Sequence, residues 1–367
     1  MKTKRILITL LTTLLISSAV ASKSADTQGV GIEDLVFSHD SSQLIFRSKQ
    51  QPAKIQFINI QTGKLVKTTP ITIHQGTEFP MGFTPDGHKL TVAVPGKISI
   101  LHNRTGKVLR QPPVPPPFNH NYRPRKAILN ASGSQQLFYT LKGTTAQLHI
   151  VHTGSGKVLR NIPLPEGVQP VQGSLQLGAI GMSPNGRDVA YITTPNKADA
   201  KPPKPTLVIY DTFQNKIKQH LELANLKLPT ISPISYSPDA QYIAIPSTPV
   251  TLIHLKTNKL TYIPTPAINT LFFSADSKKL ALLANKNQLP LHDLSSGKTT
   301  TQALKIPPQC HPSAYAISLN KRYAAIGTSC SGNSKGDSTE KILLLNASSL
   351  QPIRTYSLKP TTAIQPL

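Results

Sequence analysis

The sequence predicts an all-β protein, a seven-bladed β-propeller of four-stranded antiparallel blades. One turn signature recurs seven times, a second falls between its copies, and short apolar runs flank both. Ser38 and Ser318, in the first and last copies of the first signature, are 280 residues apart in six steps. Each step is about 47 residues, the length of one propeller blade.

The first signature is an apolar residue followed by a tight polar turn. A β-rich run follows the turn, as at 90–94 and 189–193, which is typical of antiparallel hairpins. The seven copies begin at Phe37, Phe83, Leu129, Met182, Tyr236, Phe273 and Ile317.

The second signature is an apolar run, one polar residue and a turn that ends in Gly-Lys or Asn-Lys, as at 98–107 and 148–157. Two turns per repeat predict four strands per blade, the arrangement that protects sheet edges in propellers. One repeat position accepts Asn, Asp or His, so we expect its members to bond a turn amide rather than a metal. They are Asn59, His102, His152, Asp211, His254, Asp293 and Asn346.

The amino-terminal residues predict export. Lys2, Lys4 and Arg5 precede an apolar run at 6–16, and Ala19-Val20-Ala21 is a small-x-small cleavage site. The run is shorter than the ~20 residues that span a bilayer, which disfavours a membrane anchor. We therefore expect a signal peptide at 1–21, cleavage after Ala21, and a periplasmic or secreted protein without a transmembrane segment.

The mature chain divides into three parts by pattern. The repeats occupy 31–358, which we expect to be the propeller, between an N-terminal tail at 22–30 and a C-terminal tail at 359–367. We expect a monomer.

The two cysteines predict one disulfide. The last first-signature turn lies near Asn320, so cross-strand partners there have numbers that sum to about 640, as Cys310 and Cys330 do. An exported protein meets an oxidising compartment, so a Cys310–Cys330 bridge is expected. A reactive thiol beside His311 is the alternative.

The chain is strongly basic, with 40 Lys and Arg against 16 Asp and Glu and a net charge of +24. Repeat-equivalent cations predict a positive ring and an anionic partner: an envelope protein, an anionic polymer or a lipid headgroup. A nucleic-acid partner is not expected, since 5% aromatic residues and no Trp supply few stacking platforms. A generally basic proteome is the alternative. The ring residues are Lys64, Lys67, Lys107, Arg110, Lys157, Arg160, Lys216, Lys218, Lys259 and Lys298.

Two Pro-rich insertions, 111–126 and 195–205, should be exposed because proline cannot donate to a strand ladder. Segment 111–126 is a candidate partner-binding loop, although a plain solvated connection is the alternative. Its candidate contact residues are Phe118, Tyr122, Arg123 and Arg125.

A ligand site is also predicted where chain segments enter the innermost strands, at the mouth of the central channel. Its candidate residues are the acids Glu33, Asp34 and Glu78, the bases Arg123, Arg125 and Lys126, and His311. Six of the 16 carboxylates belong to the repeat turns, and no haem, zinc or phosphate-loop motif is complete. We therefore expect no cofactor, no metal and no catalytic residue.

The turns carry a family resemblance. The runs 83–90 (FTPDGHKL), 236–245 and 273–280 resemble the FSPDG-type turn of WD-like repeats in TolB-type periplasmic proteins, and 191–196 (YITTPN) is similar to YVTN-type bacterial propellers. The resemblance covers residues 30–358, although no Trp-Asp dipeptide is present. It implies the propeller fold and says almost nothing about activity.

Two functions follow from these observations. The first is an exported, non-catalytic scaffold that mediates protein–protein or anionic-ligand interactions in the bacterial cell envelope. The alternative is a propeller enzyme of the lactonase or dehydrogenase type with a small-molecule site at the central channel. The scarcity of carboxylates and the missing cofactor motifs favour the scaffold.

Overall fold

The structure is a computed structural model that describes most of the repeat region. The predicted signal peptide, both predicted tails and, apart from Gln111, Lys204 and Pro205, both insertions lie outside the described residues. The described residues are 31–48, 54–70, 81–83, 89–94, 97–102, 107–111, 128–130, 132, 134–142, 145–153, 155–164, 180–193, 204–223, 226, 233–266, 268–284, 287–330 and 340–358.

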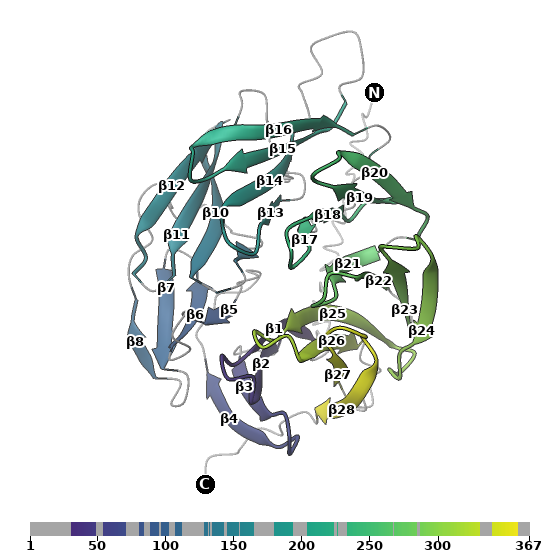
Figure 1. Cartoon of the computed structure of the whole chain (residues 1–367). Coiled ribbons are helices and arrows are strands. Elements are labelled where there is room, and N and C mark those ends of the chain that lie inside the picture. Colours follow the sequence, from purple (N-terminus) through teal and green to yellow (C-terminus); the bar gives the residue numbers. More distant parts are fainter. Residues whose placement is uncertain are drawn as a thin grey trace, which may run out of the picture.

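The strands form seven sheets arranged as the blades of a propeller (Figure 1). Each sheet contains four strands that are consecutive in the chain and antiparallel, which confirms the predicted fold. Blade 1 consists of β1 (Ile32–Phe37), β2 (Gln43–Ser48), β3 (Lys54–Asn59) and β4 (Leu65–Pro70). Blade 2 consists of β5 (Met81–Phe83), β6 (Lys89–Val94), β7 (Lys97–His102) and β8 (Val108–Arg110). Blade 3 consists of β9 (Ile128–Leu129), β10 (Gln135–Lys142), β11 (Thr145–His152) and β12 (Val158–Pro163). Blades 4 and 5 consist of β13 (Ile180–Met182), β14 (Asp188–Thr193), β15 (Thr206–Asp211), β16 (Lys216–Glu222); β17 (Ser235–Tyr236), β18 (Tyr242–Ile245), β19 (Val250–His254) and β20 (Lys259–Ile263). Blades 6 and 7 consist of β21 (Ile268–Phe273), β22 (Lys279–Ala284), β23 (Gln288–Asp293), β24 (Thr299–Ala303); β25 (Cys310–Ile317), β26 (Tyr323–Cys330), β27 (Glu340–Asn346) and β28 (Pro352–Leu358).

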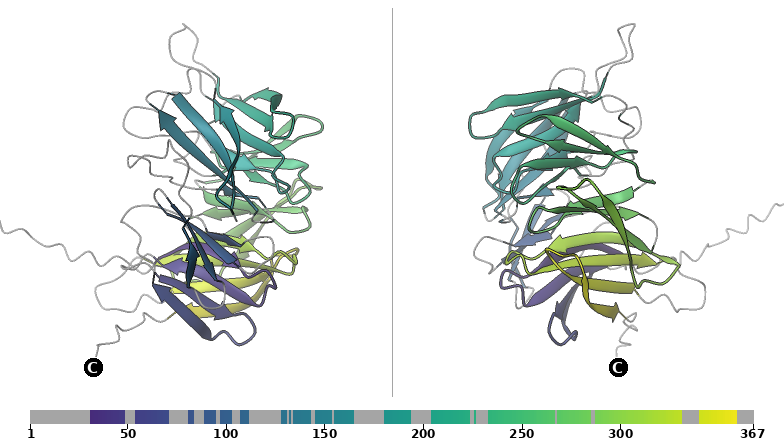
Figure 2. Two further views of the ribbon diagram at one scale, coloured as in Figure 1. Left: turned by 90° about the vertical axis from the view of Figure 1, so that its left-hand side faces the viewer. Right: turned by 45° about the vertical axis from the view of Figure 1, so that its right-hand side comes forward.

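The first strand of a blade lies near the centre of the ring and the fourth lies at its outer edge (Figure 1). Because the strands are antiparallel, the turns after the first and third strands share one face of the ring, which we call the turn face. Side views show the blades stacked sheet against sheet around the ring (Figure 2). The outermost strands therefore lie around the rim of the ring, one from each blade.

The hydrophobic core lies in the seams between neighbouring blades. One buried cluster joins blades 6 and 7, where the rings of Phe272 and Tyr315 stack with centroids 4.8 Å apart. Another joins blades 3 and 4 around Tyr191, where burial raises the pKa of the phenol to about 12. Among the described residues, further clusters join blades 1 and 2, 4 and 5, 5 and 6, and 7 and 1.

Blades 7 and 1 close the ring. Each is built from four consecutive strands, so side-chain contacts rather than a shared strand join them. Ser313 Oγ donates to the Ile32 carbonyl at 2.7 Å, and the Tyr356 hydroxyl donates to the Ile60 carbonyl at 2.6 Å. Gly327 packs so closely that a Cβ there would lie 2.8 Å from Ile32 Cγ2. The seam therefore depends on side-chain packing and a few hydrogen bonds.

The first turn of each repeat has the predicted tight geometry. In blade 1, Ser38 Oγ donates to Asp40 at 2.6 Å and accepts the backbone N–H of Gln43 at 2.9 Å. Ser41 between them has a φ of 57°, in the left-handed region. The equivalent serines of blades 4 to 7, Ser183, Ser237, Ser274 and Ser318, make the same pair of bonds.

The second turn confirms the expected role of the interchangeable Asn, Asp and His position. Asn59 Oδ1 accepts the backbone N–H of Thr62 at 2.9 Å, and His152 Nδ1 accepts that of Ser155 at 3.1 Å. The same local bond is made by Asp211, His254, Asp293 and Asn346. His102 of blade 2 precedes residues outside the described part.

The second turn of blade 6 predicts a pH dependence of stability. Hydrogen bonds from the side chain of Ser295 and the backbone and side chain of Ser296 hold the pKa of Asp293 well below its ordinary value of 3.8. Because the folded-state pKa is lowered, the stabilisation is present above pH 4 and is lost as the pH falls below that value. We expect Asp293→Asn, the residue that blades 1 and 7 use, to be less stable than the wild type at pH 7, and the difference to narrow as the pH is lowered from about 4 toward 2. Urea unfolding of both proteins across this range measures the difference, and a pH-independent difference would contradict it.

Candidate functional site

Of the seven residues predicted at the channel mouth, the structure describes three. Glu33 and Asp34 lie in β1, and His311 lies in β25, on the neighbouring innermost strands of blades 1 and 7 (Figure 1). Glu78, Arg123, Arg125 and Lys126 lie outside the described residues, as do Phe118 and Tyr122 of the predicted partner-binding loop.

Asp34 lies directly across the strand pair from Arg47 in β2. Arg47 is 2% exposed, and Asp34 is half-buried, with its carboxylate accepting the backbone N–H of Leu35 at 2.9 Å. Val36, two positions along the same strand face, packs in the seam with blade 2. Asp34 and Arg47 therefore form an oppositely charged cross-strand pair on the blade 2 side of blade 1.

His311 lies across from Ser329 of β26, inside blade 7. Ser313, two residues after His311, donates to the carbonyl of Ile32, two residues before Asp34, so His311 and Asp34 lie on opposite sides of this bond along their strands. The described residues thus place Asp34 and His311 in neighbouring strands but at different levels, and a shared site at the mouth stays a prediction.

The predicted disulfide is confirmed. Cys310 and Cys330 are direct cross-strand partners whose Cα atoms are 3.9 Å apart, and their sulfurs are bonded. The bond ties the start of the innermost strand of blade 7 to the end of the next strand. A disulfide is compatible with a periplasmic or extracellular location.

Metal-binding clusters and membrane-spanning helices are both absent from the described part of the chain. It contains no group of three or more His, Cys, Asp or Glu side chains placed to hold a metal ion. In the same residues no helix has the length and apolarity needed to cross a bilayer.

The basic residues of the predicted ring lie on or just before the fourth, outermost strands of blades 1 to 6. All are exposed except Lys67, which is half-buried with its ammonium 6.0 Å from the centre of the Phe57 ring. Lys218 is paired with Asp188 at 2.9 Å. The structure therefore places the repeat-equivalent cations on the rim next to the turn face.

Apolar side chains stand between these cations on blades 1 and 2, and on the neighbouring blade 7 Ile353 lies beside Arg354. Val66 is 55% exposed, Ile353 is 52% exposed, and Leu65, Val108 and Leu109 are each nearly half exposed. We call this stretch of β28, β4 and β8 with its flanking cations the rim arc. It consists of Lys64, Leu65, Val66, Lys67, Lys107, Val108, Leu109, Arg110, Ile353 and Arg354.

The strands of the rim arc carry basic residues and no acidic ones. Segments 61–70, 107–111 and 350–358 contain no Asp or Glu. The arc is therefore both cationic and apolar. Sequence reasoning found the cations but missed the apolar part, although pairs of apolar residues between two bases (KLVK, KVLR) repeat in the sequence and could have indicated it.

Comparison with known proteins adds the fold and little more. No protein-family model matches the sequence, and no curated protein matches it. Among solved structures, hydrazine synthase of Kuenenia stuttgartiensis superposes with a TM-score of 0.63 over 90% of this chain and 99% of that chain, at 12% identity. The shared property is the propeller fold. At this identity the likeness does not extend to a reaction or a ligand.

Proposed function

We propose that the protein is an exported, non-catalytic binding scaffold that docks on an anionic lipid surface of the cell envelope through the rim arc. The observation that carries the proposal is the pairing of exposed cations with half-exposed apolar side chains on three consecutive blades. The net charge of +24 and the disulfide support it as well.

The chemistry of the rim arc fits such a surface. A Lys or Arg near an anionic membrane contributes about 1 kcal/mol of attraction. Apolar side chains beside the cations insert into the boundary between headgroups and acyl chains, which adds a contribution that salt does not screen. A rigid outer strand presents both groups without any rearrangement of the fold.

The alternative is an enzyme at the central channel, as in the lactonase and dehydrogenase types of propeller. The structurally similar hydrazine synthase is an enzyme by its name, but 12% identity supports only the fold. Asp34 and His311 lie at different levels of neighbouring strands. No described contact favours the enzyme, so the binding scaffold is preferred.

Removing the cations of the rim arc should strongly weaken binding to anionic vesicles. We expect Lys64, Lys67, Lys107 and Arg110 replaced together by Gln to weaken binding to phosphatidylglycerol-containing vesicles roughly a thousandfold, since four charges contribute about 1 kcal/mol each. Val66→Ser with Leu109→Ser should weaken the binding that remains at high salt. Vesicle sedimentation at low and high salt measures both effects.

The matched control removes the same charge from blades 5 and 6. The exposed residues Lys256, Lys259, Lys278 and Lys298, replaced together by Gln, should leave most of the vesicle binding intact. Equal losses of vesicle binding in the two quadruple variants would mean that binding depends on the net charge of the protein and not on the rim arc. Absence of vesicle binding by the wild type, with salt-resistant capture of one envelope protein, would replace the lipid by a protein partner.

A further inference from the structure

Two buried polar atoms in the seam between blades 4 and 5 have no hydrogen-bond partner among the described residues. One is the hydroxyl oxygen of Tyr236, at the end of β17, a residue that is 8% exposed. The other is Oδ1 of Asp188, at the start of β14. Unpaired buried polar atoms are rare in folded proteins because each has lost its hydrogen bonds to water without replacement. Two of them in one seam indicate a polar site.

The closing seam shows that the positions of these two residues meet across neighbouring blades. Asp188 is the residue whose backbone N–H donates to the serine of the first turn, and Tyr323 holds this position in blade 7. Tyr236 directly precedes the turn serine of blade 5, as Phe37 does in blade 1. The rings of Phe37 and Tyr323 stack with their centroids 6.5 Å apart. The repeat therefore places Tyr236 of blade 5 against Asp188 of blade 4.

Both side chains point into the seam. Tyr236 belongs to the buried cluster that joins blades 4 and 5, and so does Ala190, which lies on the same face of β14 as Asp188. Burial, and then the negative charge of Asp188, raise the pKa of the Tyr236 phenol well above its ordinary value of 10. The phenol therefore stays neutral at physiological pH and has one O–H to donate.

Both polar groups are additions to the repeat. Three other blades have phenylalanine at the position of Tyr236, so packing of the seam does not require a hydroxyl; these residues are Phe37, Phe83 and Phe273. At the position of Asp188 the other blades have no carboxylate; their residues are Gln43, Lys89, Gln135, Tyr242, Lys279 and Tyr323. The hydroxyl and the carboxylate thus occur together at one seam of the ring.

The charges around the site are balanced. Lys218 Nζ donates to Asp188 Oδ2 at 2.9 Å. Asp211, the cross-strand partner of Asp188, accepts Nε–H and Nη2–H of Arg187, each at 3.1 Å. Two carboxylates are therefore matched by two cations, and the site suits a neutral ligand.

The innermost strands restrict the size of that ligand. The Ile234 N–H, next to β17, donates to the Ile180 carbonyl of β13 at 2.9 Å, which is a direct backbone bond between the two blades. A Cβ on Gly181 would lie 2.5 Å from the Ile234 carbonyl oxygen. So close an approach beside Tyr236 favours a ligand as small as water.

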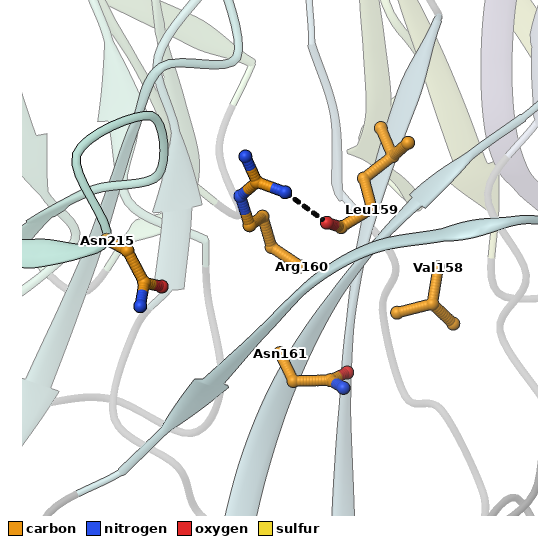
Figure 3. A pocket seen from close by; sticks show the side chains of 5 residues that line it. All are labelled: Val158, Leu159, Arg160, Asn161 and Asn215. Carbon is orange, nitrogen blue, oxygen red and sulfur yellow. Dashed lines mark hydrogen bonds between the residues drawn. The ribbon is translucent and has the colours of Figure 1, made fainter.

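The outer part of the seam is bridged directly by long side chains. Gln219 of β16 donates to the side chain of Asn258, in the second turn of blade 5. Arg160, at the equivalent position of blade 3 (Figure 3), donates to the Thr212 carbonyl of blade 4 at 3.1 Å. The unpaired hydroxyl and carboxylate oxygen lie on the first and second strands of their blades, so a ligand there joins the inner part of the seam.

We propose that the Tyr236 hydroxyl and Asp188 Oδ1 bind one water molecule between them, which joins blade 5 to blade 4. The water accepts the phenol O–H and donates one of its own O–H groups to the carboxylate oxygen. Buried waters in proteins make two to four such bonds, typically to polar groups that are otherwise unpaired. The site lies outside the rim arc, which is on blades 7, 1 and 2, and is independent of lipid binding.

Tyr236→Phe tests the proposal because the sign of its effect depends on the water. If the water is bound, the variant loses a hydrogen bond, and we expect the equilibrium constant for folding to fall about fivefold. Without a partner for the hydroxyl, its removal would leave the constant unchanged or raise it, since a desolvated polar group is deleted. Phenylalanine at this position in blades 1, 2 and 6 indicates that the packing is retained. Urea unfolding at pH 7 measures the constant.

The matched control is Tyr242→Phe, at a half-buried tyrosine that packs in the seam between blades 5 and 6, and it should unfold as the wild type does. A high-resolution crystal structure of the wild type should show a water within about 3.2 Å of both the Tyr236 hydroxyl and Asp188 Oδ1. The proposal is overturned if Tyr236→Phe is at least as stable as the wild type, if Tyr242→Phe loses as much stability, or if the phenol donates directly to Asp188 with no water between them.

Discussion

Phe46→Ala is expected to lower the free energy of unfolding by about 3–5 kcal/mol, the usual cost of deleting a buried phenylalanine side chain. Phe46 is 1% exposed and belongs to the cluster that packs blade 1 against blade 7. The chain does not connect these two blades directly, so the seam between them depends on this packing. Urea unfolding at neutral pH measures the loss.

The position of the loss should be visible as well as its size. We expect amide hydrogen exchange to accelerate in blades 1 and 7 of the Phe46→Ala protein before it does elsewhere. Phe272→Ala, equally buried but in the seam between the consecutive blades 6 and 7, should cost a similar free energy without that selective exposure. Phe213→Ala, at a side chain that is 78% exposed, should change stability by less than about 0.5 kcal/mol. Uniform exchange in the Phe46 variant would show that closure is no weaker than the other seams.

Breaking the disulfide should be the second large effect. Cys310 and Cys330 are 20 residues apart in the sequence, and a loop of this length corresponds to about 3 kcal/mol of stabilisation through restriction of the unfolded chain. The bonded strands are also those that carry the closing seam, since Ser313 of β25 donates to Ile32. We expect the double alanine variant to lose about this free energy.

Reduction distinguishes the stabilisation that comes from the disulfide bond from the stabilisation that comes from packing of the two sulfur atoms. Dithiothreitol should destabilise the wild type to nearly the level of the double variant and leave the double variant unchanged. If reduced and oxidised wild type unfolded at the same urea concentration, the bond would contribute nothing to stability.

The blades were predictable from sequence because their turns are specified locally. The Ser-x-Asp pair of the first turn and the Asn, Asp or His of the second turn form hydrogen bonds with residues only a few positions away. The turn pattern can therefore be recognised in one sequence. The disulfide followed from the same turn, because register in a hairpin is counted from its turn.

The functional surfaces were only partly predictable because they depend on neighbouring blades. Leu65 and Val66 are adjacent in sequence and both exposed, since no further strand covers the outer edge of a blade. Bulges in β1 and β25 shift residues along the channel, which pattern counting does not capture. Arg160 donates to the Thr212 carbonyl of the next blade, 52 residues later in the chain, and no local motif predicts that contact.

The self-contained blades also determine how freely the order of the chain can be rearranged. Each sheet is complete within one continuous stretch, and no described strand is borrowed across the closing seam. A circularly permuted chain, with residue 358 linked to residue 31 and new ends opened between any two blades, would keep every hydrogen-bonded ladder intact. The hydrogen bonding of the sheets therefore does not determine at which blade the chain must begin.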